Sequence, residues 1–274
     1  MRTWYGKSPV VAGILIGQGL MILFVLFEYF LVASGISDCG VIVDSCIRVL
    51  FGLMALWVIH TLWRGRFSAL FITGIPKSTW LYCIPFFLYL ALEFLFFPVS
   101  DRIATAYVPY FLLVCLQQLA TGFLEEAASK GLVMSGMRLR WKRTVKGRIG
   151  MVLLTGLFFG SLHILNVLFN HDWEQSLWNA LYSSAFGIFL AAIYLHAGNI
   201  TLCMALHAAW DIIIRIPGYF CEGIREGAVT AFIYLSQDIL LLGILPIIAV
   251  ALCVAQNKAN QAEEEILRHS GAVS

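Results

Sequence analysis

Two adjacent carboxylates, Glu125 and Glu126, end an apolar run that covers residues 107–124. A carboxylate inside a bilayer costs roughly 2.5 to 3.5 kcal/mol on insertion scales, and it usually faces other protein or a water-filled cavity. Lys130 follows Glu126 by four residues, which is about one helical turn. We expect Lys130 to pair with Glu126. Glu125, about 100° further round the helix, should then point elsewhere.

Two histidines lie inside later apolar segments, and each has companions at helical spacing. His163 follows Phe159 by four residues and precedes Asn166 by three, so these three side chains share one helical face. His207 precedes Asp211 by four residues and should share a face with it. The chain therefore offers carboxylates and imidazoles on three separate apolar segments.

These residue types suit hydrolysis of an amide, by either of two routes. Two neutral imidazoles and a carboxylate are a common ligand set for zinc, so Glu125, His163 and His207 are candidate zinc ligands. Zinc would make hydroxide available at neutral pH, and a second carboxylate would act as general base and then protonate the leaving amine. Without a metal, a glutamate and a histidine could activate water while His207 and Asp211 stabilise the oxyanion.

Each feature also has an ordinary structural explanation. A single histidine in a transmembrane helix more often bonds to a neighbouring helix than acts in catalysis, and Phe159 fits core packing. Asp44, Arg48 and Glu93 fit interfacial or structural roles in their segments. Catalysis is favoured because the pairs recur on three segments. The catalytic candidates are Glu125, Glu126, His163, His207 and Asp211.

The composition indicates a membrane protein. The chain is 60% hydrophobic and 12% charged, with a mean hydropathy of +0.85, whereas an ordinary soluble domain is about 25% charged. Several apolar runs are long enough to cross a hydrocarbon core of about 30 Å. None of the seven cysteines forms a C-x-x-C pair, which argues against a structural zinc knuckle. We predict an all-α, polytopic transmembrane helical bundle without a soluble domain or an internal repeat.

The apolar runs predict about eight spans in a single membrane-embedded domain, residues 1–274, with a motif core at about 107–214. Glycines at 156, 160, 187 and 198 should let the core helices approach closely. The expected spans are approximately 10–32, 41–63, 80–99, 107–134, 149–169, 177–195, 200–214 and 228–255.

Lysines and arginines gather in alternate loops, after the second, fourth and eighth expected spans. This alternation predicts that both termini are cytoplasmic. The basic segment 138–148 fits a topology anchor that touches anionic lipid headgroups in the bilayer, so no nucleic-acid partner is expected. Residues 256–274 should form a short polar cytoplasmic tail.

At these residues the sequence resembles the CPBP family of intramembrane proteases. That family includes the CAAX-processing prenyl endopeptidases and bacterial proteins linked to bacteriocin processing and self-immunity. Its motif order is Glu-Glu-x-x-x-Arg, then Phe-x-x-x-His, then His-x-x-x-Asn or Asp, and the likeness covers residues 124–211. Each motif is weak alone, but their order and their placement on separate spans make the set specific.

The resemblance implies a multi-pass protein of the bacterial cell membrane in which Glu125 activates water beside Glu126. It implies that His163, His207 and Asp211 bind a metal or orient water and stabilise the oxyanion. The chain departs from the motif at Lys130, because a lysine cannot make the planar bidentate clamp of arginine but can still pair with Glu126 as a point charge.

The expected activity is endopeptidase cleavage of a membrane-embedded or lipidated peptide or protein, and nothing in the sequence favours a prenylated substrate. The alternative is a non-catalytic immunity or scaffold protein of the same fold. An ion or proton transporter would use the same carboxylates as a relay. It is less favoured because the sequence has no repeat and no pair of Gly/Pro-broken helices.

Overall fold

A computed structural model describes residues 8–35, 40–62, 70–71, 75–95, 108–141, 144–220 and 228–255. The backbone in these ranges is helical apart from short turns and an isolated bridge between Phe71 and Asn199. The all-α prediction is therefore confirmed. The expected polar tail, 256–274, lies outside the described residues.

The described segments form long helices, several of which change type along their length. Seven of them are long and apolar enough to cross a membrane, and α11 adds an eighth long helix of 21 residues. The polytopic bundle is thus confirmed, while the cytoplasmic placement of the termini stays a prediction. In chain order the elements are α2 (Pro9–Ala33), α3 (Gly40–Leu62), α5 (Lys77–Leu95), α6 (Val108–Glu126), η4 (Ala127–Met134), α7 (Ser135–Trp141), α8 (Val145–Ser161), η5 (Leu162–Asn166), α9 (Val167–Asn170), α10 (Trp173–Ala197), α11 (Ile200–Phe220), α12 (Ala228–Asp238) and η6 (Ile239–Ile244).

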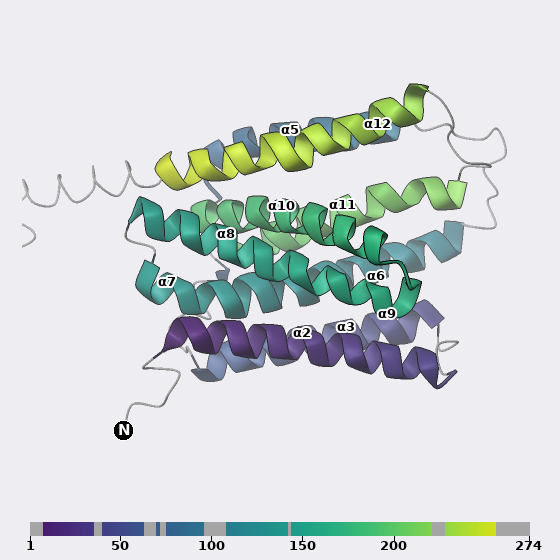
Figure 1. The fold of residues 1–274 in the computed structure, drawn as a ribbon, viewed down its shortest axis with the longest axis horizontal. Helices are drawn as coiled ribbons and strands as arrows, with labels where there is room; N and C mark the ends of the chain where they lie inside the picture. Colours follow the sequence, from purple (N-terminus) through teal and green to yellow (C-terminus); the bar gives the residue numbers. More distant parts are fainter. Residues whose placement is uncertain are drawn as a thin grey trace, which may run out of the picture.

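The helices run roughly along one common direction and stack in tiers (Figure 1). α2 and α3 form one edge of the stack, and α5 and α12 form the opposite edge. Between them lie α6, α8, α10 and α11, of which α6, α8 and α11 carry or lead into the three motifs. The motif helices therefore lie between the two edges of the stack.

Large apolar side chains cover the outward faces of the edge helices. Leu50 is 64% exposed, Leu81 is 66% exposed and Ile247 is 70% exposed. Such surfaces would be costly in water but match a hydrocarbon environment, where helices also satisfy their own backbone hydrogen bonds. The exposed apolar faces and the seven apolar helices identify the chain as a multi-pass integral membrane protein.

Glycines allow the close packing of α8 against α10. A methyl group on Gly156 or Gly160 would collide with backbone atoms of α10, and one on Gly187 would meet the Phe159 ring at 2.8 Å. The expected role is confirmed for these three glycines. Gly198 has a φ of 68° and caps the C-terminus of α10, a conformation that glycine adopts at little cost.

Arg148 departs from its expected role in the basic loop. Its side chain is buried, and its Nε donates a hydrogen bond of 3.0 Å to the backbone oxygen of Cys253. α8 begins one turn earlier, where the hydroxyl of Thr144 accepts from the Gly147 amide. Arg148 therefore ties α8 to the last helix and does not serve as a headgroup anchor.

Candidate active site

Glu125 and Glu126 end α6, and the chain enters the π-helical segment η4 directly after them. Wider π turns of this kind occur often at functional sites. Glu126 is completely buried, and its Oε1 accepts a 2.9 Å hydrogen bond from Lys130 Nζ. Lys130 is also completely buried and lies over the Phe159 ring at 4.7 Å. The predicted ion pair is therefore present.

His207 joins this pair from α11. Its Nδ1 lies 3.0 Å from Glu126 Oε1, and because a carboxylate only accepts, the ring nitrogen donates. The rings of Phe159 and Phe186 stand edge-on to the imidazole, each at 5.6 Å between centroids. We call Glu126, Lys130 and His207 the sealed cluster.

Gly122 explains how α11 comes close enough to α6 to form the sealed cluster. A methyl group at this position would lie 2.9 Å from the backbone oxygen of Met204 and 3.3 Å from the Ala208 nitrogen. Only a hydrogen fits between the two backbones. The Glu126–His207 hydrogen bond therefore depends on a glycine one turn before Glu126.

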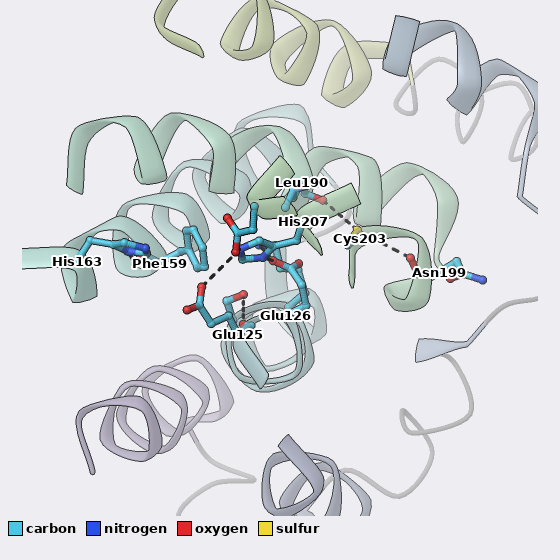
Figure 2. A network of polar contacts seen from close by, with 11 residues as sticks. Glu125, Glu126, Phe159, His163, Leu190, Asn199, Cys203 and His207 are labelled. Atoms are coloured by element: carbon cyan, nitrogen blue, oxygen red, sulfur yellow. Dashed lines mark hydrogen bonds and ion pairs between the residues drawn. The ribbon is translucent and has the colours of Figure 1, made fainter. Parts of the chain in front are cut away.

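Glu125 has a different environment from its neighbour. Its side chain is 15% exposed, and its Oε2 lies 3.6 Å from His207 Nε2. Asp211 Oδ2 lies 3.7 Å from the same nitrogen. The Nδ1 side of the imidazole ring is thus bonded to Glu126, and the Nε2 side faces the carboxylates of Glu125 and Asp211. Figure 2 shows the two glutamates beside His207.

His163 stands apart from these groups. It lies in the short 3₁₀ segment η5, and the Phe159 ring lies between it and His207 (Figure 2). The Phe159–His163 centroid distance is 5.3 Å. His163 Nδ1 makes a long contact of 3.4 Å with the Phe159 carbonyl oxygen, which leaves Nε2 free of that contact.

Two cavities meet at Glu125. The first, of about 600 Å³, lies among α2, α3, α6, α8 and α9 and has many apolar residues in its wall. The second, of about 430 Å³, lies among α6, α10, α11 and α12 and is lined by His207 and Asp211. Both are lined by Glu125, His163 and Asn166. The structure therefore brings all the catalytic candidates except the sealed Glu126 to a cavity wall.

The candidate zinc ligands do not fit a single ion in this arrangement. Zinc bonds nitrogen and oxygen at about 2.0–2.2 Å, so its ligands must converge on one point. Phe159 separates His163 from His207, and the described residues contain no group of three or more His, Cys, Asp or Glu side chains placed to hold a metal. A bound zinc stays a prediction that these contacts do not support.

Sequence reasoning missed a second polar group at the shared wall of the cavities. Glu28, Asp44 and Arg48 are joined by ion pairs, and Gln117 donates to Asp44. The four-residue spacing of Asp44 and Arg48 was a signal of pairing, but nothing in the sequence indicated that α2 and α6 would complete the group.

A comparison with family models finds one that covers the motif segment. Residues 106–213 match the family described as type II CAAX prenyl endopeptidase Rce1-like. This match confirms the family resemblance and supports an intramembrane protease of the CAAX-processing type. No curated protein and no solved structure matches the chain.

Proposed function

We propose that the chain is an intramembrane endopeptidase in which Glu125 activates water for attack on a peptide bond. The observation that carries the proposal is the contrast between two adjacent carboxylates. Glu126 is sealed and paired with Lys130, whereas Glu125 lines both cavities and faces His207. A general base must reach solvent and substrate, and Glu125 meets that condition.

In the proposed reaction Glu125 accepts a proton from water as the water oxygen attacks the carbonyl carbon. The carbonyl electrons move onto its oxygen, which becomes an oxyanion. When the C–N bond breaks, Glu125 returns the proton to the leaving nitrogen. Acid–base transfer of this kind contributes roughly 10²–10⁴-fold to the rate.

His207 is proposed to face the developing oxyanion. Glu126 fixes the ring through Nδ1, and Nε2 is directed toward the space beside Glu125 and Asp211. An N–H group at Nε2 would donate to the oxyanion, as a preorganised donor. Asp211, which lies beside Nε2, would stabilise a positive charge on the ring and keep Nε2 in this orientation.

His163 is proposed to orient the water or the substrate from the far side of Phe159. It lines both cavities together with Glu125 and Asn166. A proton on Nδ1 would suit the contact of that nitrogen with a backbone carbonyl, and Nε2 could then accept a hydrogen bond. These steps form a glutamate-type mechanism that uses only side chains of this chain.

The proposed substrate is a membrane-embedded or lipidated peptide or protein. The first cavity is lined by apolar side chains such as Met21, Phe24 and Val25, which suit an apolar chain segment. The family description favours a prenylated peptide with a CAAX end as the first substrate to try. A role in bacteriocin immunity stays a prediction of the resemblance.

The test compares new peptide termini in membranes that contain wild type or Glu125→Gln at matched protein levels. Glutamine keeps the shape of the side chain but cannot accept the proton, so we expect the cleavage rate to fall about 10³-fold. Glu93→Gln is the matched control, because Glu93 is buried on α5, bonds to Tyr89 and lines neither cavity.

Termini that appear with wild type and Glu93→Gln but not with Glu125→Gln would support the proposal and identify the substrate. Full cleavage by Glu125→Gln would refute it. Identical termini in all three membranes, with the cellular phenotype intact in Glu125→Gln, would instead favour the non-catalytic scaffold.

A further inference from the structure

A polar cluster outside the three motifs joins α2, α3 and α6 at the wall of the first cavity, and two of its members, Arg48 and Gln117, also line the second cavity. Arg48 Nε donates to Asp44 Oδ2 at 2.8 Å, and Arg48 Nη2 donates to Glu28 Oε1. Gln117 Nε2 donates to the same oxygen of Asp44. We call Glu28, Asp44, Arg48 and Gln117 the wall cluster.

The wall cluster is half-buried inside an apolar bundle. The side chains of Arg48, Glu28 and Asp44 are 16%, 20% and 24% exposed, respectively. The Arg48 guanidinium also lies over the Phe24 ring at 5.0 Å. Charged groups within a membrane protein are costly, and they commonly mark functional positions. A cluster that crosses three helices fixes those helices relative to one another.

Gln117 carries this constraint to Glu125. The two residues are eight positions apart, so they lie on one face of α6 with Thr121 between them. The Thr121 hydroxyl donates to the Gln117 carbonyl oxygen at 3.0 Å along the same face. Gln117 and Glu125 both line the first and second cavities.

Arg48 also lies near Glu125 at the cavities. The two residues line both cavities together, and their opposite charges attract each other. α3 also approaches α6 closely, because a methyl group on Gly52 would collide with the Phe123 ring. Gly52 lies one turn after Arg48, so the face of α3 that carries Arg48 packs against α6.

We propose that Arg48 and Gln117 are positioning residues for Glu125. Their hydrogen bonds to Asp44 fix the orientation of α6 and so hold the Glu125 carboxylate between the two cavities. The proposal rests on the proposed role of Glu125 as the general base. A misplacement of about 1 Å can cost about 10²-fold in rate, so a link two turns away has a measurable effect on turnover without touching the substrate.

The test measures kcat and KM with an internally quenched peptide whose farnesylated cysteine lies three residues from its carboxyl end. Gln117→Leu removes the link between α3 and α6, and we expect kcat to fall about tenfold with KM changed less than about twofold. Gln117→Glu should have the same effect, because it places like charges at hydrogen-bond distance.

The exchange variant Asp44→Asn/Gln117→Glu supplies the rescue. The amide at position 44 then donates to the carboxylate at position 117, which restores the link with donor and acceptor reversed. We expect kcat to recover to within about threefold of wild type. Glu93→Gln again serves as the control, since it changes a buried carboxylate away from both cavities.

Unchanged kcat in Gln117→Leu, or equal losses in Gln117→Glu and the exchange variant, would overturn the positioning role while leaving the proposed function intact. If the wild type does not cleave the peptide, the failure concerns the proposed function or the choice of peptide, and not the positioning role. The positioning role is then tested through the thiol introduced by Glu125→Cys.

That thiol is labelled with a water-soluble methanethiosulfonate reagent, and mass spectrometry follows the modification at position 125. With Gln117→Leu added, we expect the labelling rate to change at least about threefold, because the side chain at 125 moves relative to the cavities. Equal rates with and without Gln117→Leu would overturn the proposal independently of catalysis.

Discussion

Two charged clusters flank Glu125, and they differ in what can reach them. In the sealed cluster, Glu126 and Lys130 are completely buried behind the site, and only His207 reaches the wall of the second cavity. The wall cluster around Arg48 lies at the cavities, with its charged side chains 16–24% exposed. Because both of its side chains are completely buried, the Glu126–Lys130 pair can hold the site in place but is not exposed to a substrate.

This difference predicts different responses to mutation. A buried charge that loses its partner destabilises the fold strongly, because nothing else can solvate it. A partly exposed charge can be solvated by water in the cavity, so its loss costs less stability and changes the geometry instead. Variants of the Glu126–Lys130 pair should therefore act first on folding, and variants of the wall cluster first on turnover.

The largest effect on stability is expected from Lys130→Met. The substitution keeps the length and apolar stem of the side chain but leaves the Glu126 carboxylate buried without its cation. We expect a loss of roughly 3–5 kcal/mol in the free energy of unfolding. The measurement is unfolding in detergent micelles, followed by circular dichroism.

Lys130→Arg is the matched variant, because a guanidinium restores the charge and can make two parallel hydrogen bonds. We expect it to keep most of the stability and the activity. If Lys130→Met unfolds like wild type, the Glu126–Lys130 pair does not stabilise the fold, and the proposed difference between the two clusters is wrong.

A smaller effect is expected from Gly122→Ala, which separates the sealed cluster without removing a charge. The added methyl group meets backbone atoms of α11 at 2.9 and 3.3 Å, so α11 must shift away from α6. We expect a cost of about 1–3 kcal/mol in stability and about a tenfold fall in kcat, because His207 moves with α11.

Gly150→Ala is the control for this prediction, since a methyl group there would meet nothing within 4 Å. It should keep wild-type activity and gain slightly in helix stability. Equal activity in both variants would mean that the approach of α11 to α6 does not set the position of His207.

Much of the bundle and part of the site could be predicted from the sequence. The apolar runs were sufficient for the long helices because span length is set by bilayer thickness. The Glu126–Lys130 pair and the His207–Asp211 contact followed from four-residue spacing, which depends only on the local helix. Each of these predictions concerns residues close together in the chain.

The features that the sequence did not reveal depend on distant parts of the chain. Residue patterns gave no sign that Phe159 would separate His163 from His207, because the orientation of η5 is set by packing. The wall cluster needs partners from α2, α3 and α6. Arg148 looked like a headgroup anchor, but its burial depends on contact with the last helix.

The smallest expected effect is that of metal removal, and it decides whether His207 is a metal ligand. A zinc ion held by Glu125, His163 and His207 would require the two imidazoles to converge, although Phe159 now lies between them. The hydrogen bond of Nδ1 to Glu126 at 3.0 Å would leave Nε2 as the ligand atom of His207. Because zinc ligation needs that rearrangement, we expect 1,10-phenanthroline to change peptide cleavage by the purified protein less than about twofold.

Metal analysis of the same sample provides the control. A stoichiometric zinc together with activity that is lost on chelation and restored by zinc would contradict the prediction, and it would indicate a metal centre that includes Glu125 and His207.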